Sequence, residues 1–166
     1  MPTVTWENIS SNLQINGNKI RRSLDTGDYW PGANIVETID KATGFVEFKI
    51  TPPVDPAAMT TIVGVNKNGR VAANDEYDFS FYFTDDEVFA YENGDLGAYI
   101  GIPYVNGATF RLKMVSGDVE YQVKNPGDTD YSTFVTSSLH ADPNACYTIN
   151  VTIRINGDGL HILAMS

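Results

Sequence analysis

The sequence predicts an all-β protein in which two antiparallel sheets stack face to face. Apolar and polar residues alternate with a period of two along most of the chain. Turn residues, above all Asn-Gly pairs, interrupt this alternation at short intervals. No long stretch shows the 3.6-residue period of an amphipathic helix. With roughly a dozen strands and no helix, two stacked sheets would bury one face of every strand, and a closed barrel is the alternative.

Four segments alternate most strongly, and they are residues 77–83, 110–114, 119–123 and 147–155. In the first of them, Tyr77 would share one strand face with Phe79, Phe81 and Phe83. Half-buried antiparallel strands with the apolar face inward explain such a pattern. Shorter strands are predicted at residues 12–15, 18–24, 33–38, 44–51, 60–66, 87–91, 96–101, 133–140 and 160–165.

Turns are predicted between these strands. Asn-Gly pairs supply the positive φ values of tight hairpins, and they are Asn16-Gly17, Asn93-Gly94, Asn106-Gly107 and Asn156-Gly157. The proline-rich residues 51–56 predict a stiff loop, since strands of the same kind lie on both sides, and residues 55–60 could form one short helical turn. The 166 residues therefore predict one β-sandwich domain over residues 1–166.

Acidic residues dominate the charge of the chain. It has 21 Asp and Glu against 11 Lys and Arg, which gives a net charge of −10 at pH 7. Nucleic acids and anionic membranes are bound through clusters of Lys and Arg, so we expect neither as a partner. The first residues also lack the basic start and apolar core of a signal peptide.

Paired carboxylates of the kind that β-sandwich glycosidases use are incomplete in this chain. Glu76 and Asp78 would share one strand face, but Ser80 and Phe81 stand where a third carboxylate would be needed. We therefore expect these two carboxylates to lie on a solvated outer face.

Nucleophilic catalysis also lacks a recognised motif. A serine or cysteine nucleophile needs a histidine base held by a third group, and neither His140 nor His161 lies in such a motif. Cys146 adjoins an apolar strand, so we expect a buried and inert thiol. The sequence thus predicts a protein that is not an enzyme.

Several short motifs follow one another in a set order along the chain. They are Trp30-Pro31-Gly32-Ala33, Gly44-Phe45-Val46-Glu47-Phe48, Val88-Phe89-Ala90-Tyr91-Glu92-Asn93-Gly94, Phe110-Arg111-Leu112 and Gly117-Asp118-Val119-Glu120-Tyr121. Their order over residues 28–124 resembles the concanavalin A-like, SPRY-like jelly-roll modules of bacterial surface and phage virion proteins. The resemblance implies a concanavalin A-like jelly-roll sandwich and a location on a virion or an extracellular surface. Because this fold hosts lectins, glycosidases, peptide binders and capsid proteins, it leaves the ligand open.

Two aromatic loops have the composition of a carbohydrate site. A sugar ring stacks on an exposed aromatic side chain, and amide groups bind its hydroxyls. We therefore predict carbohydrate binding by Tyr29, Trp30, Asn34, Tyr104 and Asn106. Packing at the edge of the sandwich is the alternative role for Trp30.

One further loop has the composition of a calcium site. Asn125, Asp128 and Asp130 place three oxygen-bearing side chains close together in sequence, and Ca²⁺ prefers oxygen ligands. The alternative is an ordinary turn, which is rich in the same residue types. No other cofactor is expected, because two His and one Cys are too few for a standard structural zinc site.

These observations predict a non-catalytic surface recognition module that binds a glycan. The alternative is a structural or decoration protein of a phage capsid or tail, which acts only through contacts with a protein shell. Oligomeric state separates the two hypotheses, because an assembly protein should form a homo-oligomer or bind a shell, whereas a sugar-binding module can act as a monomer.

Overall fold

The computed structural model describes residues 3–23, 30–51, 60–68, 76–95, 101–154 and 158–166. These residues form fourteen β-strands, and no helix is present among them. Within this part of the chain, no helix is therefore long and apolar enough to cross a membrane.

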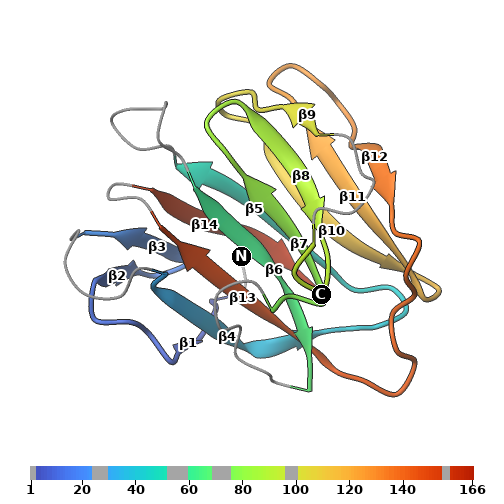
Figure 1. Cartoon of the computed structure of the whole chain (residues 1–166), viewed down its shortest axis with the longest axis horizontal. Helices are drawn as coiled ribbons and strands as arrows, with labels where there is room; N and C mark the ends of the chain where they lie inside the picture. Colours follow the sequence, from blue (N-terminus) through green and yellow to red (C-terminus); the bar gives the residue numbers. More distant parts are fainter. Residues whose placement is uncertain (1–2, 24–29, 52–59, 69–75, 96–100, 155–157) are drawn as a thin grey trace.

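The strands form two antiparallel sheets of seven strands each, which we call sheet A and sheet B. Sheet A has the order β1 (Trp6–Glu7), β4 (Gly32–Ile39), β13 (Tyr147–Ile153), β6 (Thr61–Lys67), β7 (Phe79–Phe83), β8 (Glu87–Tyr91) and β9 (Ile102–Pro103). Sheet B has the order β12 (Ser132–Thr136), β11 (Asp118–Lys124), β10 (Thr109–Val115), β5 (Phe45–Thr51), β14 (Gly159–Met165), β3 (Lys19–Arg22) and β2 (Leu13–Asn16). Figure 1 shows the two sheets stacked with their strands running in similar directions, as in an aligned sandwich. The predicted all-β jelly-roll sandwich is thus confirmed.

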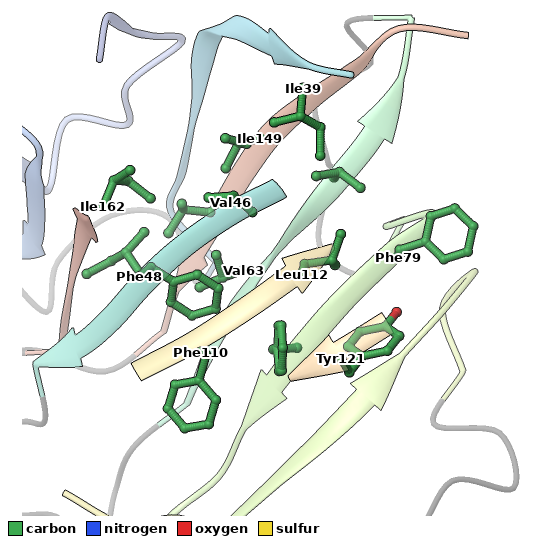
Figure 2. Close-up of a cluster of buried hydrophobic side chains, with 14 of the residues drawn as sticks. Ile39, Val46, Phe48, Val63, Phe79, Phe110, Leu112, Tyr121, Ile149 and Ile162 are labelled. Atoms are coloured by element: carbon green, nitrogen blue, oxygen red, sulfur yellow. The ribbon is translucent and has the colours of Figure 1, made fainter. Parts of the chain in front are cut away.

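Aromatic rings from both sheets fill the space between them. Phe81 and Phe83 of β7 meet Phe48 of β5 and Phe110 of β10, with ring centroids 5.5 Å apart for Phe48 and Phe81 and 4.8 Å apart for Phe83 and Phe110. Figure 2 shows Phe48, Phe110 and Tyr121 directed into this core. Edge-to-face contacts of this kind add to the free energy gained by burying apolar area.

The predicted Asn-Gly hairpins are confirmed in part: Asn93-Gly94 has a positive φ at both residues, at Asn16-Gly17 only the glycine has one, and Asn106-Gly107 connects β9 of sheet A to β10 of sheet B instead of closing a hairpin. Gly17 has a φ of 58°, and Asn93 and Gly94 have φ values of 50° and 80°. At the β10–β11 turn, Ser116 and Gly117 have φ values of 54° and 97°. These positive values let two strands reverse within two residues. Asn156-Gly157, the predicted helical turn and most of the predicted strand at 96–101 lie outside the described residues.

The strand face predicted for Tyr77 is wrong. β7 begins only at Phe79, and the hydroxyl of Tyr77 lies 2.7 Å from Oγ1 of Thr152. Thr152 alternates along β13 with the core residues Val151 and Ile153, so Tyr77 packs on the outer face of sheet A. Alternation assigns faces only within a strand, because the chain can change direction in the residues that precede it.

The prediction of a buried Cys146 thiol is also wrong. Cys146 is exposed, although the next residue, Tyr147, is buried. Cys146 precedes β13 and has the parity of Thr148, whose side chain faces away from the core. An apolar strand therefore buries alternate neighbours only, and this thiol lies outside the core.

Candidate functional site

The connections at one end of the sandwich contain most of the residues predicted to bind ligands. We call this the loop end and define it as residues 8–12, 23, 30–31, 60, 84–86, 104–108, 125–131, 154 and 158. Antiparallel pairing brings these residues together, because the start of β4 lies beside the end of β13 and the start of β14 lies beside the end of β3. Asp158 joins the two sheets here, since its carboxylate accepts hydrogen bonds from Thr60 and Thr61 of sheet A.

Trp30 lies at this end beside a cation. Its side chain is half-buried, and the guanidinium carbon of Arg154 lies 5.1 Å from the centroid of the indole ring. Backbone hydrogen bonds fix both partners, from Ile153 N to Pro31 O and from Arg154 N to Thr60 O, each 3.0 Å long. The contact is a cation–π pair that sets the orientation of a partly exposed aromatic ring.

Tyr104 closes the core at the same end. Its ring stacks on Phe110 at 6.3 Å and 14° and meets the edge of Phe83, and its backbone N–H donates to Asp86 O at 2.7 Å. The side chain is half-buried. Burial raises the pKa of Tyr104, and the negative charge of Asp158 raises it further. Tyr104 therefore combines a packing role with a hydroxyl close to the Asp158 carboxylate.

Two buried charged residues at this end, Asp158 and Arg22, were not revealed by the sequence. Asp158 is fully buried, and its Oδ2 accepts hydrogen bonds from Thr60 N at 3.0 Å and Thr61 Oγ1 at 3.1 Å. Burial raises the pKa of Asp158 to about 6, although these hydrogen bonds and the charge of Arg22 act in the opposite direction. Oδ1 of Asp158 has no hydrogen-bond partner among the described residues.

Arg22 is the positively charged one of these two residues. It is buried, its backbone N–H donates to Asp158 O at 2.9 Å, and its guanidinium donates to the carbonyls of Ile153 and Arg154. In the sequence, only the alternation along β3 could have indicated that Arg22 is buried, since it places Arg22 on the same inward face as Ile20. A charged residue at an inward position of a strand is expensive without a partner, so the pattern could have indicated one.

The other predicted carbohydrate-binding residues are in different surroundings. Asn34 is buried, and its carboxamide donates to Glu7 Oε1 at 2.5 Å and accepts from Asn8 Nδ2 at 2.8 Å. These bonds direct the Asn34 side chain along the outer face of sheet A, and carbohydrate binding by Asn34 stays a prediction. Asn106 is exposed at the loop end, and Tyr29 lies outside the described residues.

The predicted calcium-binding residues form hydrogen bonds within their own loop. Asn125 N donates to Asp128 Oδ2 at 2.9 Å, Asp128 N donates to Asn125 O at 3.0 Å, and Thr129 Oγ1 donates to Asp130 Oδ2 at 2.9 Å. No group of three or more His, Cys, Asp or Glu side chains in the described ranges could hold a metal ion. Calcium at Asn125, Asp128 and Asp130 stays a prediction, which thermal melting can test.

The residues considered for catalysis lie away from the loop end. Asp78 accepts a hydrogen bond from Lys67 N at 2.7 Å, and its own N–H donates to Asn66 Oδ1 at 2.8 Å. His140 lies 3.0 Å from Asp118 Oδ1, with both side chains exposed. Both contacts lie at the opposite end of the sandwich.

The sequence matches no protein-family model and no curated protein. Among solved structures, the chain is similar to the TRIM65 PSpry domain, with a TM-score of 0.67 and 14% identity over 98% of this chain and 93% of that chain. It is also similar to the exoplasmic/lumenal domain of VIP36 in its Ca²⁺-bound form, with a TM-score of 0.64 and 10% identity over 99% of this chain and 82% of that chain. A legume lectin-like domain from Entamoeba histolytica gives a TM-score of 0.63 and 10% identity over 99% of this chain and 88% of that chain. These similarities confirm the concanavalin A-like jelly-roll fold.

Proposed function

We propose that this protein is a non-catalytic recognition module that binds carbohydrate at the loop end. The observation that carries the proposal is the half-buried indole of Trp30, which Arg154 holds where connections from both sheets meet. An oriented aromatic ring can stack on the apolar face of a sugar, while nearby polar side chains bind its hydroxyls. Exposed Asn106 and the guanidinium of Arg154 supply such polar groups.

The similar solved structures support this proposal through their fold. VIP36 has also been solved in a Ca²⁺/Man3GlcNAc-bound form, which matches this chain with a TM-score of 0.64 at 9% identity. The same sandwich is used by SPRY domains such as those of TRIM65 and human HERC1. Because one fold serves different ligands, the choice of carbohydrate rests on the residues of the loop end.

The motif order further leads us to propose display on a phage virion or a bacterial surface. A decoration protein of a capsid or tail would act instead through protein contacts, for example by adding a strand to a sheet edge. Among the described residues, the edge strands β1 and β9 of sheet A have two residues each, whereas β12 and β2 at the edges of sheet B have five and four, so strand addition would have to use sheet B. We favour the glycan because of the oriented Trp30 ring, and light scattering after gel filtration should give the mass of a monomer.

A glycan array tests the proposed function. The wild-type protein should bind a defined group of glycans, and Trp30→Ala should lose this binding while Trp30→Phe keeps part of it. Trp6→Ala is the matched control, because Trp6 is a half-buried indole bonded to Gly17 O, away from the loop end. The proposal would be contradicted if the wild-type protein bound no glycan on a broad array, or if a folded Trp30→Ala protein bound glycans as the wild type does.

A further inference from the structure

A hollow lies on the outer face of sheet B and borders the loop end, since its lining includes Gly159, which follows Asp158. It has a volume of about 610 Å³ and lies over β2, β3, β14 and the end of β5. The residues that give it its chemistry are Gln14, Asn16, Lys19, Arg21 and Thr51. We call this hollow the basic groove.

The charge of the basic groove is opposite to that of the whole protein. β2, β3 and β14 contain no Asp or Glu, although the chain has 21 of them. β5 contains a single carboxylate, Glu47, and it pairs with Arg111 at 2.8 Å. Among the described residues, positive charge is therefore unbalanced on this half of the sheet.

The strand register gathers the cations of this face. His161 of β14 is paired with Lys19 of β3 on one side and Lys49 of β5 on the other, and Arg21 is paired with Gly159 in the next outward row. Adjacent strands are about 4.8 Å apart, so the backbones of Lys19 and Lys49 lie roughly 10 Å apart. Among the described residues, no carboxylate forms an ion pair with Lys19, Arg21 or Lys49.

The pKa of His161 indicates a positive electrostatic potential between Lys19 and Lys49. Burial lowers the pKa of His161, and the charges of Lys19 on β3 and Lys49 on β5 lower it further. These are the charged groups that face the imidazole from the two strands packed beside it. An anion bound between the two lysines would relieve their mutual repulsion.

We infer that the basic groove is a second binding site, separate from the loop end, for an acidic polysaccharide that carries carboxylate or sulfate groups. Lys19 and Arg21, which line the groove, and Lys49, which lies beside it in the row of His161, bind the charges that are spread along the polysaccharide. Gln14, Asn16 and Thr51 supply the amide and hydroxyl groups that bind sugar hydroxyls. The inference does not depend on glycan binding by Trp30.

A polysaccharide fits the basic groove better than other polyanions do. The net charge of −10 repels any polyanion, so the lining of the groove distinguishes the two ligands. Among the described residues, the groove contains no aromatic side chain on which a base could stack, whereas Gln14, Asn16 and Thr51 can bind sugar hydroxyls. A second copy of this chain could offer the exposed acidic residues 85–87 instead, and the experiment includes this outcome.

The test is calorimetric titration at low salt with a heparin oligosaccharide, an oligogalacturonate, neutral dextran and a short DNA duplex. At least one of the two acidic oligosaccharides should bind, while dextran should not. Lys19→Gln/Lys49→Gln should weaken this binding at least about tenfold, because charged hydrogen bonds are lost at two points. Lys41→Gln/Lys113→Gln is the matched control, which removes two positive charges elsewhere and should change affinity less than about twofold.

Two more measurements locate the site. Trp30→Ala should bind the acidic oligosaccharide as the wild type does, which separates this site from the loop end. By NMR, the pKa of His161 should rise when the oligosaccharide binds, because a nearby anion favours the imidazolium. The inference is overturned if neither acidic oligosaccharide binds, if both double variants weaken binding equally, or if DNA binds as tightly. Self-association at low salt that Lys19→Gln/Lys49→Gln abolishes would assign the groove to a second copy and overturn it as well.

Discussion

The two ends of the sandwich both have backbone hydrogen bonds between their connections, but they differ in the side chains that add to these bonds. At the end opposite the loop end, backbone bonds run from Ser166 N to Phe45 O at 3.0 Å and from Ala141 N to Gly117 O at 2.7 Å, and the buried carboxylate of Glu92 accepts from Tyr121 and Ser137. At the loop end, backbone bonds such as Arg154 N to Thr60 O at 3.0 Å are joined by Asp158, bonded to the backbone of Thr60, and by Arg22, bonded to the carbonyls of Ile153 and Arg154. The difference is that the loop end also presents the partly exposed rings of Trp30 and Tyr104. Connections that present such side chains can change their surface chemistry while the sheets stay intact, which suits recognition.

The largest effect on stability should come from substitution of Gly44, at the end opposite the loop end. A Cβ atom there would lie 2.3 Å from the backbone N and O of Asp40 and 2.6 Å from Ser166 O. Gly44→Ala should therefore lower the free energy of unfolding by about 3 kcal/mol, because rigid backbone must move. Urea unfolding measures this value. Gly117→Ala is the control, since it has open space but a φ of 97°, and it should cost about 1 kcal/mol.

Asp158→Asn should stabilise the protein at neutral pH. The folded-state pKa of Asp158 is about 6 against an ordinary value of 3.8, so folding favours its protonated form. The stability that this proton provides is complete below about pH 4 and is lost as pH rises through 6. The variant should therefore exceed the wild type by roughly 2 kcal/mol at pH 7.5, with little difference near pH 4. Urea unfolding across this range would contradict the account if the difference did not change with pH.

Asn34 and Asn106 should separate packing from binding. Asn34→Ala removes a buried carboxamide and leaves Glu7 and Asn8 without a partner, so it should cost about 1–2 kcal/mol of stability. Asn106→Ala, at an exposed position, should change stability by less than about 0.5 kcal/mol but should weaken glycan binding. Thermal melting and binding assays on both variants check this contrast. The reverse pattern would show that burial does not decide which asparagine contacts the ligand.

Calcium should have the smallest effect. The carboxylates of Asp128 and Asp130 already accept hydrogen bonds within their loop. Calcium bound by Asn125, Asp128 and Asp130 should therefore raise the Tm by only about 1 °C, because it must displace these bonds, although a ligand that binds the folded state always raises the Tm. No rise in Tm, or a rise that Asp128→Asn leaves unchanged, would contradict a calcium site in this loop.

The sequence predicted the sheets well because alternation reports local geometry. β10 and β11 begin and end within a residue or two of their predicted bounds, and the Ser116-Gly117 turn joins them. Interactions between segments that are distant in sequence were not predicted. The backbone N–H of Arg22 donates to Asp158 O across most of the chain, and the Tyr77 hydroxyl contacts Thr152 outside the core. Period-two patterns cannot show such pairings, because they describe one strand at a time.

The candidate site was predictable only in part. Trp30 and Tyr104 could be chosen by residue type, and the antiparallel order places both at the loop end. Asn34 was chosen by residue type in the same way, but it lies on the outer face of sheet A, where residues of the neighbouring strands bury it. Residue type alone does not show such burial, because burial depends on the side chains that the neighbouring strands place beside the residue.

The most direct test of the central claim is NMR mapping of the backbone amides while a neutral glycan selected on the array is titrated. We predict that the largest shifts occur at residues 30–32, 104–108, 154 and 158, and that Trp30→Ala removes them. Shifts centred on residues 40–44, 116–117 and 137–146, at the end opposite the loop end, would contradict the assignment of recognition to the loop end.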